Sequence, residues 1–92
     1  MKLVVDATAF TDLQEIGVWI AEDTPNAAGR VVATALATIE PLRSLPRLAR
    51  PGRARGTFER LVAGTPYIVV FELWAKPPAV VITAVVHGAR NR

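Results

Sequence analysis

The sequence predicts an α+β fold in which a helical hairpin packs on one face of a small, mostly antiparallel sheet. Two observations lead to this prediction. Apolar residues recur with helical spacing in the first half of the chain, and apolar runs separated by Gly and Pro turns fill the second half. The 92 residues therefore predict a single domain, residues 1–92, with the element order β-α-α-β-β-β.

The chain is expected to begin with a strand and an amphipathic helix. Residues 2–5 are a short β-branched run, which favours a strand. The helix follows from apolar residues spaced three and four apart, namely Ala9, Phe10, Leu13, Ile16, Gly17 and Ile20. Asp12 and Glu15 lie off this stripe and are expected in water, whereas Trp19 is expected at the edge of the core.

A second helix is predicted to follow after a tight turn. Thr24-Pro25 is a strong helix start, because a threonine oxygen can cap the first turn and proline fits the first helical position. Pro41 should end the helix near Glu40, because it has no N–H to donate. The residues expected in the core are Ala28, Val31, Val32, Ala35, Ile39 and Leu42.

The second half of the chain predicts a loop and three strands. Residues 48–56 form the loop, and residues 57–63, 67–75 and 79–87 form the strands. The last two strands are apolar on both faces, and such strands are normally covered on both sides. Because two helices can cover only one face, the other face is expected to meet a partner.

Composition excludes several classes of protein. The chain has no cysteine, one histidine, His87, and one serine, Ser44, so neither a thiolate or His-rich metal site nor a serine hydrolase is expected, and no cofactor or metal is predicted. The longest apolar region, residues 66–86, is interrupted by charges and prolines, so it predicts no membrane span. The first apolar run is too short for a secretion signal, which makes a cytoplasmic location the expectation.

Charge is distributed unevenly along the chain. Residues 1–40 carry two basic and six acidic groups, a net −4, whereas residues 41–92 carry nine basic and two acidic groups, a net +7. The basic half contains an arginine cluster, made of Arg43, Arg47, Arg50, Arg53, Arg55 and Arg60. Arginine suits phosphates and carboxylates equally, so a nucleic acid, an acidic protein segment or a simple solvated loop all fit this pattern. Phe58 is the only nearby aromatic residue for base stacking.

A second candidate site involves residues that are spread over the strands. Glu59, Arg60, Tyr67, His87 and Arg90 could supply the base, cation and acid of a metal-free ribonuclease. The simpler interpretation makes His87 a strand-end residue with a local hydrogen bond. It also makes Tyr67 a packed aromatic residue with its hydroxyl in solvent.

Several short motifs run through the chain in a fixed order. An A-x-x-D-L-x-x-I pattern begins at Ala9, a Gly-Arg pair follows at Gly52, G-T-x-E begins at Gly56, G-T-P-Y-I begins at Gly64 and H-G-x-R begins at His87. Together they make nearly the whole chain resemble the ParE-type toxins of the RelE/ParE toxin–antitoxin superfamily.

One position departs from the family pattern. Phe58 stands where these toxins usually have an arginine. Residues two apart on a strand point to the same face, so Arg60 could replace the missing charge.

The resemblance implies the toxin of a type II toxin–antitoxin module, of the kind that stabilises plasmids. Such a toxin stops growth by inhibiting DNA gyrase without turnover of its own, and a ParD-like antitoxin neutralises it in a hetero-oligomer. No sequence-specific DNA binding is expected from the toxin alone. The residues expected to contact the target or the antitoxin are Arg50, Arg53, Arg55, Arg60, Tyr67, Trp74, His87 and Arg90.

Two alternatives remain open. A ribosome-dependent mRNA endonuclease of RelE type would use Glu59, Arg60, His87 and Arg90, although those nucleases typically carry an arginine where Ile68 follows the strand tyrosine. A degenerate family member would keep antitoxin binding but lack toxicity.

Overall fold

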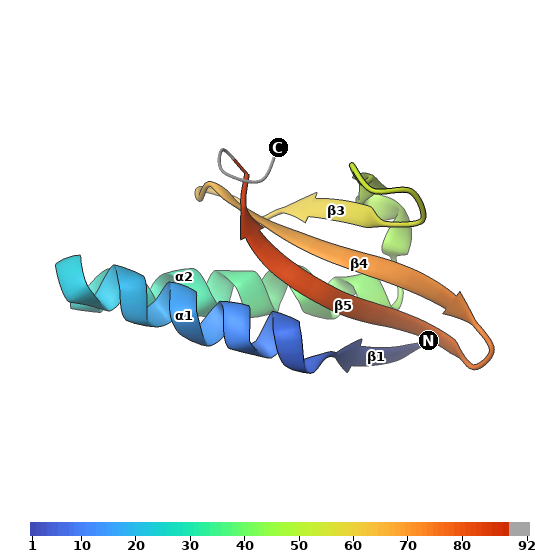
Figure 1. The fold of residues 1–92 in the computed structure, drawn as a ribbon, viewed down its shortest axis with the longest axis horizontal. Coiled ribbons are helices and arrows are strands. Elements are labelled where there is room, and N and C mark those ends of the chain that lie inside the picture. The colour runs from blue at the N-terminus through green and yellow to red at the C-terminus, as the bar shows by residue number, and fades with distance from the viewer. Residues whose placement is uncertain (89–92) are drawn as a thin grey trace.

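The computed structural model describes residues 1–88 and confirms the α+β prediction, with a helical hairpin on one face of a five-stranded sheet (Figure 1). The two helices and five strands are joined by short loops and two 3₁₀ turns. In chain order the elements are β1 (Lys2–Val5), α1 (Ala7–Asp23), α2 (Pro25–Ile39), η1 (Glu40–Arg43), η2 (Pro46–Leu48), β2 (Arg50–Pro51), β3 (Phe58–Leu61), β4 (Tyr67–Ala75) and β5 (Pro78–His87).

The sheet has the strand order β1-β5-β4-β3-β2. All neighbouring strands pair antiparallel except β1, which lies parallel to β5 at the edge of the sheet. The sequence did not predict this position. After β1, Asp6 caps α1 by accepting a hydrogen bond from the Ala9 N–H (3.1 Å), and the Asp6 N–H donates to the Ile82 carbonyl (3.0 Å). These bonds fix the start of α1 beside β5.

The two helices form the predicted antiparallel hairpin, whose tip extends past the sheet in Figure 1. Pro25 is the first residue of α2, as predicted, and α2 ends at Ile39, where η1 takes over before Pro41. The predicted side-chain cap at Thr24 is wrong. Its backbone closes the turn instead, since the Thr24 N–H donates to the Ile20 carbonyl (2.7 Å) and its own carbonyl accepts from Ala27 (3.0 Å).

The core lies between the hairpin and the sheet. Its largest fully buried side chains are Leu42, Val62, Val69, Phe71, Val80 and Ile82. From α2, the predicted Ala28, Ala35 and Ile39 are buried, while Val31 and Val32 are half-buried. In residues 1–88, no helix is both long and apolar enough to cross a membrane.

Three predictions about α1 need correction. Phe10 is 56% exposed and Trp19 is 60% exposed, so neither belongs to the core. Phe10 is one residue, about 100° of helix rotation, from Ala9, and therefore falls beside the stripe that touches the sheet. Asp12 is not free in water, because it accepts a hydrogen bond from the Val85 N–H (3.0 Å).

The face of the sheet opposite the helices is less bare than predicted. Ile68, Ala79 and Val81 are only 3%, 2% and 5% exposed. The backbone of Gly88 lies against Ile68, since a Cβ built on Gly88 would be 3.0 Å from the Ile68 Cδ1, and Ala79 pairs across the strands with the much larger Trp74. Trp74 itself is 51% exposed, so apolar surface remains open toward the β4–β5 turn.

Candidate functional site

A tight loop carries the middle of the arginine cluster. Backbone bonds close it from Gly52 N–H to the Thr57 carbonyl (2.7 Å) and from Thr57 N–H to the Ala54 carbonyl (3.1 Å), and the Thr57 hydroxyl also donates to Ala54 (2.6 Å). A Cβ at Gly52 would lie 2.2 Å from the Thr57 Oγ1, so only glycine fits there. We refer to residues 50–57 as the arginine loop. These hydrogen bonds hold the backbone that carries its three arginines.

Glu59 fastens the arginine loop to β3. Its side chain is 7% exposed, and a buried carboxylate must be paired and hydrogen-bonded to be tolerated. Glu59 Oε2 accepts from the Arg53 backbone N–H (3.0 Å), and Oε1 lies 3.5 Å from the Arg50 guanidinium. This carboxylate is therefore committed to holding the loop.

Phe58 and Arg60 also have structural contacts. They share one face of β3, as predicted, because they pair with Phe71 and Val69 of β4. The Phe58 ring stacks on Phe71 with ring centres 5.6 Å apart, so this position has a packing role. Arg60 donates to the Leu48 carbonyl (2.7 Å) and so ties η2 to the sheet.

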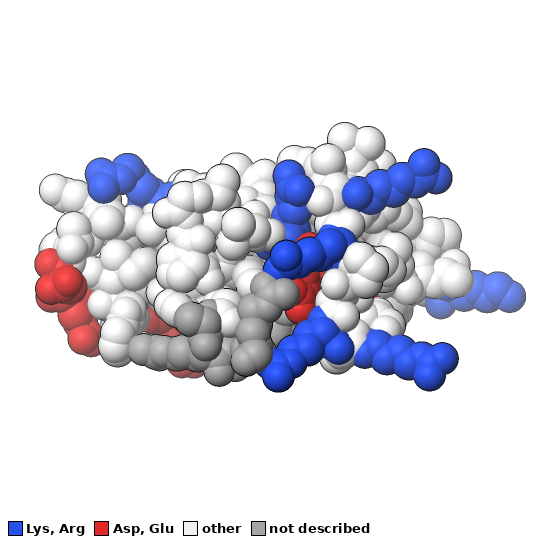
Figure 2. Space-filling view, turned by 90° about the horizontal axis from the view of Figure 1, so that it is seen from above, with Lys and Arg blue, Asp and Glu red and all other residues white. Residues whose placement is uncertain are grey.

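The arginine cluster gathers at one end of the molecule. Figure 2 shows most of the basic side chains toward the end opposite the hairpin tip, with a small acidic spot among them. Arg47, Arg50, Arg53 and Arg55 are exposed there, and Arg43 pairs with Glu40 at 3.2 Å. Acidic residues, including the exposed Glu22 and Asp23, occupy the hairpin tip. The uneven charge of the sequence thus becomes a separation of charge in space.

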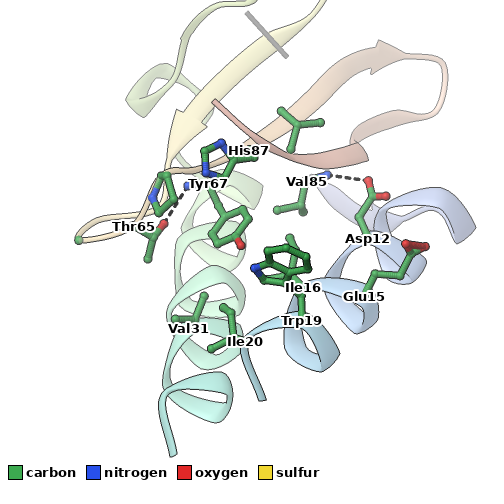
Figure 3. Close-up of a pocket in the computed structure, with 13 residues that line it drawn as sticks. Asp12, Glu15, Ile16, Trp19, Ile20, Val31, Thr65, Tyr67, Val85 and His87 are labelled. Atoms are coloured by element: carbon green, nitrogen blue, oxygen red, sulfur yellow. Dashed lines mark hydrogen bonds between the residues drawn. The ribbon is translucent and has the colours of Figure 1, made fainter. Parts of the chain in front are cut away.

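A groove of about 730 Å³ opens between α1 and the junction of β4 with β5 (Figure 3). We call it the α1–β5 groove. The side chains that line it from α1 are Asp12, Glu15, Ile16, Trp19 and Ile20, and those from the sheet side are Thr65, Pro66, Tyr67, Val85, Val86 and His87.

Hydrogen bonds and ring packing fix the walls of this groove. Tyr67 and His87 are a cross-strand pair whose rings meet edge to face, with centres 5.6 Å apart. The Tyr67 N–H donates to the Thr65 hydroxyl (3.0 Å), and the Gly88 N–H donates to the Pro66 carbonyl (2.8 Å). The groove therefore presents Tyr67 and His87 from a rigid strand end.

The structure does not assemble the residues of the nuclease hypothesis. On β4, the partner of Glu59 is Val70 and the partner of His87 is Tyr67. Val70 and Tyr67 are three residues apart. Because successive residues on a strand face opposite sides, the side chains of Glu59 and His87 point to opposite faces of the sheet. Arg90 lies outside the described residues.

The other predicted contact residues form two separate groups. Arg50, Arg53 and Arg55 lie on the arginine loop, whereas Tyr67 and His87 lie in the α1–β5 groove. Trp74 belongs to neither group, because it is near the β4–β5 turn, where its Nε1 donates to Glu72 (3.1 Å).

Sequence reasoning missed the α1 side of the groove. Asp12, Glu15 and Trp19 are spaced three and four apart, which places them on one face of a helix. A tryptophan on a mostly acidic face was the available signal, because a large exposed aromatic residue is uncommon away from interfaces.

Comparison with known proteins decides the family. The protein-family model described as the ParE toxin of the type II toxin–antitoxin system parDE matches residues 3–92. The chain belongs to the ParE toxin family. This ParE-family toxin is similar to Y4kP of Sinorhizobium fredii, which is named as a candidate toxin. The two sequences are 40% identical over 65 residues, which make up 71% of this chain and 68% of Y4kP.

Solved structures show the same fold. The chromosomal ParDE system of P. aeruginosa matches with a TM-score of 0.86 at 20% identity, covering 95% of both chains. The RelBE2 toxin–antitoxin complex of Mycobacterium tuberculosis matches with a TM-score of 0.62 at 27% identity, covering 94% of this chain and 95% of that one. A YoeB/ParE toxin of Agrobacterium tumefaciens matches with a TM-score of 0.66 at 14% identity, covering 95% and 98%. This ParE-family toxin therefore shares its architecture with both ParE and RelE proteins.

Proposed function

We propose that this ParE-family toxin stops growth when it acts alone and is neutralised by a ParD-like antitoxin encoded beside it. The family match over residues 3–92 carries the proposal. Its structural support is a pair of separate surfaces, the exposed arginine loop and the α1–β5 groove. A module of this kind would stabilise a plasmid or chromosomal region, and both proteins would act in the cytoplasm.

The antitoxin is expected to meet the arginine loop with acidic groups. Arg50, Arg53 and Arg55 are exposed on a frame that Glu59 and Gly52 hold in place. Charges arranged on a rigid frame speed association and select partners of opposite sign. The complex is therefore a hetero-oligomer whose assembly depends on salt concentration.

The proposed target is DNA gyrase, which the toxin would block by binding rather than by catalysis. Family membership supports this target, and the placement of Glu59 and His87 on opposite faces supports a mechanism without a ribonuclease site. Purified toxin should change gyrase supercoiling or the level of gyrase–DNA cleavage complexes. Unchanged supercoiling and unchanged cleavage complexes at saturating toxin would contradict gyrase as the target.

Growth is the direct test of the toxin assignment. The reading frame should be induced alone and together with its immediate neighbour, with the neighbour alone as control. We expect arrest in the first case, normal growth in the second and a co-purifying complex. Normal growth at high toxin levels, in a host with a sensitive target, would contradict the toxin assignment and favour a degenerate member that lacks toxicity.

The likeness to RelBE2, at 27% identity, supports a second candidate, a ribosome-dependent ribonuclease. Arg60 and His87 share the helix-side face of the sheet, so this pair would be its minimal site. Translating ribosomes incubated with the toxin should then yield codon-linked mRNA cleavage that His87→Ala abolishes. Intact mRNA would exclude this candidate.

A further inference from the structure

The α1–β5 groove is acidic as well as apolar. Asp12 and Glu15 line it, and no Lys or Arg is among its described lining residues. The charge continues beyond the groove, because Glu22 lies two turns after Glu15 on the same side of α1 and is exposed. A partner segment seated here would therefore lie beside two carboxylates, with which a basic side chain can pair.

Two aromatic side chains line the same groove. Trp19, which is 60% exposed, and Tyr67 both project into it from opposite walls, with Glu15 to one side (Figure 3). A Lys or Arg side chain is held well by this combination, because its aliphatic stem packs on the rings while its cation interacts with the ring faces and the carboxylate.

The carboxylates keep the capacity to bind a cation. One oxygen of Asp12 accepts the Val85 N–H, but an ionised carboxylate offers about four acceptor positions. That bond also fixes Asp12 relative to β5, so the acidic wall is formed before a partner arrives. A preformed wall reduces the entropy cost of binding.

We propose that the α1–β5 groove binds an arginine or lysine side chain of the antitoxin's docking segment, with its stem between Trp19 and Tyr67 and its cation near Glu15. This inference rests on the proposed function and specifies the partner further. The docking segment must place a basic residue at the groove and acidic residues at the arginine loop. That order complements the toxin's own charge separation, acidic at the hairpin and basic at the opposite end.

Two variants with the same change in net charge test the proposal. Glu15→Gln removes an acidic group from the groove, whereas Gln14→Lys adds one positive charge on the neighbouring residue, which is exposed and does not line this groove. Affinity for the protein of the adjacent reading frame should be measured by titration at low and high salt, after circular dichroism has shown that both variants fold. We expect Glu15→Gln to weaken binding about five- to tenfold at low salt and Gln14→Lys to change it less than about twofold.

A double-mutant cycle then locates the basic partner residue. Each Lys and Arg of the adjacent protein is replaced by Met and measured against the unmodified toxin and against Glu15→Gln. At one position, the Met substitution should weaken binding to the unmodified toxin but should weaken binding to Glu15→Gln much less. A double-mutant cycle shows such a difference when the two residues contact each other directly. If the complex forms but Glu15→Gln matches Gln14→Lys and no position couples, the groove proposal is overturned. If the unmodified toxin forms no complex at all, the proposed function fails instead.

Discussion

The carboxylate of Asp12 on α1 accepts a hydrogen bond from the backbone N–H of Val85 on β5 (3.0 Å), joining residues 73 positions apart. The β1 strand pairs with β5 only as far as Ile82, so the Val85 N–H lies beyond the end of its neighbouring strand. Asp12 takes the place of a strand carbonyl there. The adjacent Leu13 enters the core, so Asp12 and Leu13 both attach α1 to the sheet.

We predict that Asp12→Ala lowers the free energy of unfolding by about 1–3 kcal/mol, because a part-buried N–H loses its acceptor. Asp12→Asn keeps an acceptor oxygen and should lose clearly less. Urea unfolding of the three proteins measures both differences. Equal midpoints for Asp12→Ala and the unmodified chain would show that the bond is unimportant for stability.

Two glycines should respond to alanine in opposite directions. Gly52→Ala places a Cβ against Thr57 and should destabilise the fold by about 1–3 kcal/mol. Gly29→Ala, on exposed helix α2 with nothing within 4 Å of the new Cβ, should stabilise it by about 0.5–1 kcal/mol. Thermal unfolding gives the sign of each change. A Gly52→Ala variant that is not destabilised would contradict the described loop geometry, and a destabilised Gly29→Ala variant would contradict the open helical position of Gly29.

Removing the Glu59 carboxylate should loosen the arginine loop. Glu59→Ala leaves the Arg53 N–H without this acceptor, so the amide of Arg53 should exchange its hydrogen faster and stability should fall by about 1–3 kcal/mol. Glu40→Gln is the control, because it breaks an exposed ion pair with Arg43 and should cost less than about 1 kcal/mol. Unchanged exchange at Arg53 would mean that Glu59 does not hold the loop.

Charge reversal on the arginine loop should weaken antitoxin binding. The double variant Arg53→Glu/Arg55→Glu is expected to bind at least about tenfold more weakly at low salt, mainly through slower association. The reference is Arg30→Glu/Lys2→Glu, which reverses two basic residues of the acidic half, both exposed and outside the arginine loop. Surface plasmon resonance at two salt concentrations measures the association rate and the affinity of each double variant. An equal loss of affinity in both double variants would indicate a response to net charge alone.

The parts of the fold that depend on local sequence were predictable. Pro25 begins α2, and β4 spans Tyr67–Ala75 as expected, because proline geometry and apolar runs between turns act within a few residues. The arginine cluster was also found from sequence, because its members are close together in the chain.

Long-range contacts were not predictable in this way. Asp12 is expected in water because no residue near it in sequence indicates a contact with Val85. Glu59 enters the nuclease hypothesis because its bond to Arg53 depends on how the loop folds back. The α1–β5 groove was missed for the same reason. Trp19 and Tyr67 are brought together only when the hairpin packs on the sheet.

Hydrogen–deuterium exchange of the toxin, alone and bound to the protein of the adjacent reading frame, tests the proposal that the partner covers both surfaces. We predict slower exchange on binding in residues 12–20, 64–67 and 85–88, which form the groove, and in residues 50–57, the arginine loop. Slower exchange confined to the outer face of the hairpin and the β4–β5 turn, with both predicted surfaces unchanged, would contradict it.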